Sequence, residues 1–96
     1  MEPMQPEKLV LLRISGRVQG VGYRAWARRQ AEALRLRGWV RNEPDGSVAA
    51  LLSGPADVVD AMMERLRQGP RGSLVRSIET MPAGPLQVPA GFQILR

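Results

Sequence analysis

The sequence contains no cysteine and no histidine. Without cysteine the chain has no disulfide bonds, thiolate nucleophiles or thiolate metal ligands. Without histidine it lacks the commonest general base and the commonest nitrogen ligand for metal ions. Any chemistry must therefore depend on arginine, asparagine, serine, tyrosine, carboxylates and main-chain amides. We expect a site with no metal ion and no cofactor.

Aromatic residues and lysine are also scarce. The aromatic residues are Tyr23, Trp26, Trp39 and Phe92, and the single lysine is Lys8. No apolar run approaches the roughly 18 residues that a membrane span requires. The start of the chain is acidic and interrupted by proline, unlike a signal peptide. We therefore expect a cytoplasmic protein that does not bind membranes, with a flexible tail at residues 1–7 and one domain at residues 8–96.

The net charge of the chain is +5, which favours anionic partners. Phosphorylated metabolites, nucleic acid and anionic membranes all carry the matching charge. A sheet that binds nucleic acid would need several exposed aromatic residues for base stacking. The few aromatic residues here, with no run resembling an RNA-recognition motif, do not match that pattern. We expect a phosphorylated small molecule as the partner and no nucleic acid.

The first half of the chain predicts a strand, a glycine-containing loop and a helix. The strand is Lys8–Ser15, because Val10, Leu12 and Ile14 alternate with other residues and share one face. The loop is Gly16–Gly22, and the helix is predicted at Tyr23–Leu36. The helix residues at core spacing are Tyr23, Ala27, Ala31 and Leu34.

The second half predicts a hairpin, a second helix and two further strands. The expected ranges are strands Gly38–Glu43 and Ser47–Ser53 around a turn at Pro44–Gly46, a helix from Gly54–Pro55 to Gly69–Pro70 with core residues Val59, Met63 and Leu66, a strand at Leu74–Met81 and an edge strand at Phe92–Leu95. Val75 and Ile78 are an odd number of residues apart. Both can face the core only if their strand contains a β-bulge.

This order of elements predicts an α+β fold of the ferredoxin-like, split βαβ type. Both helices would lie on one face of an antiparallel sheet. A right-handed crossover makes the first two strands parallel, so their C-terminal ends lie at the same edge of the sheet. With one strand between them, the ends near Gly16 and Asn42 would be about 10 Å apart. Side chains from both ends could then meet at one small ligand.

The loop Gly16–Gly22 leads directly into a helix N-terminus, which favours anions. Glycines allow successive main-chain amides to converge on one oxygen cluster, and Arg24 adds a planar pair of donors. The loop alone fits equally well with a tight turn followed by a solvated arginine. The residues from Gly20 to Ala25 also fit a dinucleotide-binding pattern. We reject that interpretation, because the hairpin at Pro44–Gly46 makes the third strand antiparallel and the chain is too short for a doubly wound sheet.

Asn42 ends the second predicted strand, where an asparagine often bonds its own turn. However, the segments Ile14–Arg24 (ISGRVQGVGYR) and Gly38–Gly54 (GWVRNEPDGSVAALLSG) resemble the two signature motifs of the acylphosphatase family. The resemblance continues through Leu66–Pro70 and Gly91–Ile94, so it covers nearly the whole chain from Lys8. It implies the same ferredoxin-like fold.

The resemblance also implies roles for individual residues. Arg24 would bind the phosphate and Asn42 would position the attacking water, as the two catalytic residues. The main-chain amides of the phosphate cradle would belong to Gln19, Gly20, Val21, Gly22 and Tyr23. Three residues depart from the family pattern: Tyr23 stands where phenylalanine is usual, Arg35 where glycine commonly ends the helix, and Arg65 where tryptophan is frequent.

The implied reaction is hydrolysis of a small acyl phosphate to a carboxylate and inorganic phosphate. A carboxylate leaves readily, so catalysis would need positioning and electrostatics and no metal ion. Phosphate or sulfate would bind as product or mimic, and we expect a monomer. One alternative is a nucleic-acid-binding module. Another is an acylphosphatase-like domain that has lost catalysis and acts as a regulatory unit, but the presence of both Arg24 and Asn42 argues against it.

Overall fold

The computed structural model describes residues 7–84 and 86–96. Its elements, in chain order, are β1 (Glu7–Arg17), α1 (Tyr23–Ala33), β2 (Arg37–Asn42), β3 (Val48–Pro55), α2 (Ala56–Gln68), β4 (Leu74–Met81) and β5 (Phe92–Ile94). The predicted tail, residues 1–7, lies outside the described residues except for Glu7. Glu7 is the first residue of β1 and pairs with Pro55 of β3.

The strands form one sheet in the order β4-β1-β3-β2-β5. Strand β3 pairs antiparallel with both β1 and β2, which therefore run parallel to each other with one strand between them. This is the arrangement that places the C-terminal ends of β1 and β2 at the same edge. The expected fold class is confirmed, with one difference: β5 pairs parallel to β2, so the sheet is mixed.

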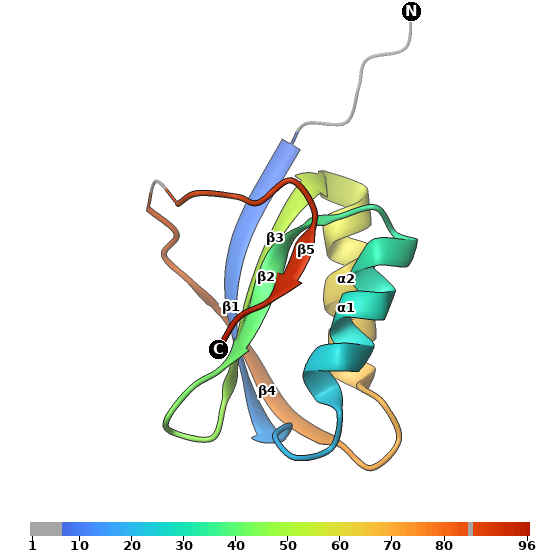
Figure 1. The fold of residues 1–96 in the computed structure, drawn as a ribbon, viewed down its shortest axis with the longest axis vertical. Helices are drawn as coiled ribbons and strands as arrows, with labels where there is room; N and C mark the ends of the chain where they lie inside the picture. Colours follow the sequence, from blue (N-terminus) through green and yellow to red (C-terminus); the bar gives the residue numbers. More distant parts are fainter. Residues whose placement is uncertain (1–6, 85) are drawn as a thin grey trace, which may run out of the picture.

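Both helices lie on one face of the sheet (Figure 1). The core between the two layers contains the predicted alternating residues of β1, and Val10, Leu12 and Ile14 are all buried. On α1, Tyr23, Ala27 and Ala31 are buried and Leu34 packs against them, as expected. On α2 the prediction was partly wrong. The buried residues are Val59, Met62 and Leu66, whereas Met63 is only partly buried.

The β-bulge that the sequence requires lies between β1 and β4. Ser15 pairs with Ser77, but the next residue, Gly16, pairs with Val75, so Arg76 is the extra residue. Because of this shift, Val75 and Ile78 both pack against the core. Gly16 has a φ of 129°, and a β-carbon there would collide with the main-chain oxygen of Leu74. The close approach of β4 to β1 therefore requires glycine at this position.

Helix α1 ends three residues earlier than predicted, at Ala33. Leu34 is the C-cap, and Arg35 has a left-handed φ of 58°. The N–H of Arg35 donates to Glu32 O at 3.0 Å, and the N–H of Leu36 donates to Ala31 O at 2.9 Å. This pair of hydrogen bonds is a Schellman motif, which favours glycine at the left-handed position. The predicted departure at Arg35 therefore falls on a strained residue.

The opposite face of the sheet carries a smaller cluster, made of Trp39, Ala49 and Leu51 with Leu11, Val88 and Leu95 packed against it. The guanidinium of Arg41 lies 4.7 Å from the centre of the Trp39 ring. A sheet face that binds RNA by base stacking would expose such a ring to solvent, but Trp39 is buried.

Within the part of the chain that the structure describes, neither helix has the length and apolar character needed to cross a membrane.

Candidate active site

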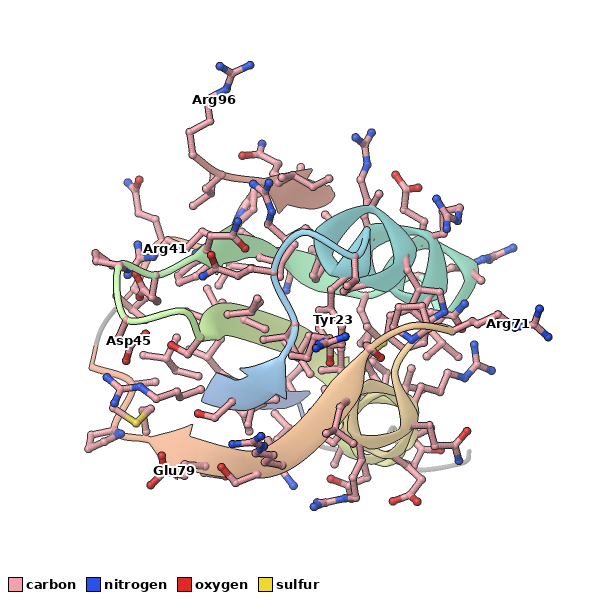
Figure 2. All side chains as sticks on the ribbon, turned by 90° about the horizontal axis from the view of Figure 1, so that it is seen from below. Tyr23, Arg41, Asp45, Arg71, Glu79 and Arg96 are labelled. Carbon is pink, nitrogen blue, oxygen red and sulfur yellow. The ribbon has the colours of Figure 1, made fainter. Side chains whose placement is uncertain are left out.

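The loop between β1 and α1 lies at one end of the molecule, between the β2–β3 hairpin and the α2–β4 connection (Figure 2). Gly20 and Gly22 have φ values of 74° and 76°. A β-carbon at either position would meet nothing within 4 Å. Glycine is therefore favoured at both positions because the backbone is left-handed there. A side chain would have room at either position. Their conformation turns the chain sharply from the end of β1 into α1.

The N-terminus of α1 is open to an anion. Gly22 is its N-cap, and among the described residues no side chain donates or accepts a capping hydrogen bond there. The first turn contains no acidic residue. The N–H groups of the first turn therefore keep their partial positive charge, with no capping side chain from residues 7–84 and 86–96 to neutralise it. Such an end binds phosphate-like groups readily.

Arg24 follows directly in the first turn of α1 and is half-buried. Its Nη1 lies 3.5 Å from the main-chain oxygen of Leu95, a long hydrogen bond that leaves most of its donors unused. A guanidinium has five N–H donors, so four remain and one edge of the plane can face a ligand. Arg24 is therefore both anchored by the C-terminal segment and able to bind two oxygens of a phosphoryl group.

Asn42 is the last residue of β2 and pairs with Val48 of β3. Its carboxamide oxygen is buried and accepts no hydrogen bond from residues 7–84 and 86–96. A buried polar atom without a partner costs free energy, and proteins keep such atoms where function requires them. The alternative interpretation, that the side-chain oxygen of Asn42 bonds its own turn, is thus not met. The turn is held instead by Asp45.

Asp45 accepts hydrogen bonds from the hydroxyl of Ser47 at 2.6 Å and from its N–H at 2.9 Å. These two bonds lower the pKa of the Asp45 carboxyl below its usual value. The main chain closes the same turn through Gly46 N–H to Glu43 O, at 3.1 Å. The hairpin therefore forms without the side chain of Asn42.

One pocket, of about 210 Å³, joins these features. Five of the predicted phosphate-binding and catalytic residues line it from the loop and α1, and Asn42 lines it from β2. Its lining is Val18, Gln19, Gly20, Gly22, Tyr23, Arg24, Ala25, Asn42 and Ile94. Of the predicted site residues, Val21 is not part of the lining. The start of α1, which follows β1, and the end of β2 thus bring Arg24 and Asn42 to one cavity.

Ile94 of β5 was not expected in the site. It lines the pocket because β5 pairs parallel with β2, with Val40 opposite Ile94. The next residue, Leu95, bonds Val40 O through its N–H at 2.8 Å and supplies the oxygen that Arg24 contacts. The sequence signalled an edge strand here but not its partner. A parallel pairing between distant segments has no local sequence signature.

Tyr23 contributes an amide to the pocket, but its phenol points into the core. The hydroxyl donates to Leu66 O at 2.7 Å, and the residue is 1% exposed. Burial raises the pKa of the Tyr23 phenol far above its usual value. The phenol is therefore a structural anchor and not an acid that could protonate a leaving group.

A family model described as Acylphosphatase matches residues 10–94. The chain belongs to the acylphosphatase family. An acylphosphatase of Sinorhizobium medicae is 48% identical over 89 residues, which cover 93% of this chain and 95% of that protein. The predicted resemblance is confirmed.

Two solved structures have the same fold. The acylphosphatase of Bacillus subtilis superposes with a TM-score of 0.85 at 32% identity, covering 92% of this chain and 98% of that one. An acylphosphatase from Coxiella burnetii gives a TM-score of 0.80 at 31% identity, covering 93% of each chain.

The three departures from the family pattern lie outside the pocket or point away from it. The hydroxyl of Tyr23 donates to Leu66 O of α2, and Arg35 follows the C-cap of α1. Arg65 donates from Nη1 to the carboxamide oxygen of Gln30 at 2.9 Å, which joins α2 to α1 at the surface. The side chains of Tyr23 and Arg65 therefore connect the two helices, whereas Arg35 is exposed and affects the end of α1 through its left-handed backbone.

Proposed function

We propose that this protein hydrolyses acyl phosphates by direct attack of water on phosphorus, with Arg24 and Asn42 as its catalytic residues. The single observation that carries the proposal is the meeting of three groups at one pocket. These are the uncapped N-terminus of α1, the guanidinium of Arg24 and the unpartnered oxygen of Asn42.

The phosphoryl group would occupy the cradle formed by the loop amides of Gln19 to Tyr23. Arg24 would add two parallel N–H donors to the equatorial oxygens, where negative charge gathers in the transition state. The pocket of about 210 Å³ is smaller than the roughly 300–1,000 Å³ clefts that enclose drug-sized ligands. It therefore suits a phosphoryl group better than a nucleotide. Inorganic phosphate, or sulfate as its mimic, should bind at the same place.

The oxygen of Asn42 would accept a hydrogen bond from the attacking water and hold it in line with the bond to be broken. The water oxygen forms the new bond to phosphorus, and the carboxylate leaves with the electron pair of the broken P–O bond. An amide is too weak a base to take the proton, so the proton passes to a phosphoryl oxygen of the substrate. A carboxylate needs no protonation to leave, which fits a site without histidine or a titrating tyrosine.

Phosphate release from benzoyl phosphate tests the proposal. The wild type should turn the substrate over, and Arg24→Ala should lose at least about 100-fold in kcat/KM, as expected for loss of a transition-state donor. Arg29→Ala is the matched control, because Arg29 is an exposed arginine of the same helix that does not line the pocket. Activity of the wild type equal to that of Arg24→Ala would contradict the assignment.

Three further expectations stay predictions from the sequence: a monomer, a cytoplasmic location, and the division into a tail at residues 1–7 and a domain at residues 8–96. Light scattering on the purified chain measures the first.

The alternative function, a nucleic-acid-binding module, has its own test. A salt-sensitive gel shift with nucleic acid, in a protein that releases no phosphate, would favour it.

A further inference from the structure

The side chain of Gln19 joins the phosphate loop to the β2–β3 hairpin. Its Nε2 donates to Glu43 O at 2.9 Å and to Ser47 O at 2.7 Å. Both acceptors are main-chain carbonyls, so the amide nitrogen must be the atom that faces them. Both N–H groups of the carboxamide are used in these bonds, which are partly buried.

The two acceptors flank the residue that would position water. Asn42 and Val48 form the last pair of the β2–β3 ladder, and Glu43 and Ser47 are the next residues on either side of the turn. The N–H of Glu43 also donates to Ser47 O at 2.8 Å. The Gln19 carboxamide therefore binds the carbonyls of both residues in the first pair of the turn, which lies one residue beyond Asn42.

Among the described residues, no other hydrogen bond connects these two parts of the site. Across residues 7–84 and 86–96, the Gln19 bonds are the hydrogen bonds that join the loop of residues 18–22 to the hairpin. The remaining bonds of the hairpin are internal, such as Asp45 to Ser47, or reach Arg13 at 3.9 Å in an exposed ion pair. An exposed ion pair of that length contributes little to the stability of the hairpin position.

We infer that the Gln19 side chain is a positioning residue, which sets the distance between the Asn42 oxygen and the phosphate cradle. The inference rests on the proposed function for its catalytic consequence. In the proposed site, the main-chain amide of Gln19 belongs to the phosphate cradle. Its side chain fixes the position of the hairpin that carries Asn42. A small misplacement of a positioned reactant lowers kcat strongly, whereas ground-state binding of phosphate changes less.

Gln19→Met tests this, since it keeps the approximate length of the side chain and the main-chain amide but removes the carboxamide that makes both bonds. We expect kcat for benzoyl phosphate to fall about 10-fold or more, while the inhibition constant of inorganic phosphate changes less than about threefold. Gln30→Ala is the control, because it removes a carboxamide that bonds Arg65 at the helix surface. If Gln19→Met unfolds, Gln19→Ala replaces it.

A double-mutant cycle separates positioning from general damage. In an Asn42→Ala background, Gln19→Met should lower kcat no further, because the group that it positions is already absent. Additive losses in the double variant, an unchanged kcat in the single variant, or an equal loss in phosphate binding would each overturn the inference.

A second readout does not depend on activity. In ¹⁵N spectra the side-chain NH₂ signals of Asn42 should shift or broaden in Gln19→Met and stay in place in Gln30→Ala. Unchanged Asn42 signals in Gln19→Met would refute the positioning of Asn42 by Gln19, even in a protein without activity. A wild type that releases no phosphate, with Asn42 signals that respond to Gln19, would refute the proposed function alone.

Discussion

The hydroxyl of Tyr23 donates a 2.7 Å hydrogen bond to the main-chain oxygen of Leu66, which ties the start of α1 to the end of α2. Tyr23 is the only tyrosine of the chain and stands at the edge of the pocket. Its ring also contacts Trp26, with the ring centres 5.5 Å apart. The bond therefore holds both helices at the end of the molecule where the phosphate loop lies.

This bond predicts a loss of stability at alkaline pH. The unfolded phenol titrates near pH 10, and burial raises the pKa of the folded phenol above that value. The contribution is fully present below about pH 10. Above it, the free energy of unfolding should fall by up to about 1.4 kcal/mol per pH unit, because only the unfolded chain releases the proton. Urea unfolding between pH 9 and about pH 11.5 measures this slope.

Tyr23→Phe should abolish that alkaline slope. At neutral pH it should cost about 1 kcal/mol, because Leu66 O loses its buried donor. The two proteins differ only in the phenol hydroxyl, so the difference between their slopes isolates the tyrosine. Equal alkaline slopes in wild type and Tyr23→Phe would show that the phenol is not held in its neutral form.

Arg35→Gly should stabilise the protein by roughly 0.5–1 kcal/mol. The left-handed φ of 58° is costly for a residue with a β-carbon, and the gain is reduced by the greater freedom of glycine in the unfolded chain. Arg35→Ala is the control, since it removes the charge and keeps the β-carbon. A similar gain in both variants would assign the effect to charge and not to the backbone.

Asn42→Ala should separate activity from stability. We expect the activation free energy for hydrolysis of benzoyl phosphate to rise by about 3 kcal/mol or more, which lowers kcat accordingly. The free energy of unfolding should stay equal or rise, because the oxygen that is removed is buried and has no partner in the described residues. Substantial turnover by Asn42→Ala would remove its water-positioning role, while a large loss of stability would indicate a structural one.

Activity should not depend on a metal ion. The wild type assayed in millimolar EDTA should keep its full kcat, because in the proposed mechanism Arg24 and main-chain amides would supply the positive charge at the phosphoryl group. Activity lost in EDTA and restored only by added Mg²⁺ would overturn this expectation. Recovery by buffer exchange without metal would instead indicate inhibition by the chelator.

Local patterns in the sequence accounted for the element order and for most of the core. Alternation in β1 placed Val10, Leu12 and Ile14 in the core, and the spacing of Val75 and Ile78 required the bulge that the structure contains. The choice between Met62 and Met63 was not decidable in this way. Both lie at helical spacing from Val59 and Leu66, and only the contact of α2 with the sheet selects Met62.

By itself, the sequence determined the chemistry available to this protein: glycines that turn the loop, an arginine in the first helical turn, an asparagine at a strand end, and no histidine or cysteine. These are properties of residue types and short spacings. The tertiary structure decided which groups meet. It brought Ile94 and Leu95 to the site, buried the Asn42 oxygen and joined Gln19 to the hairpin. Such contacts depend on the packing of segments far apart in the chain, which no local pattern encodes.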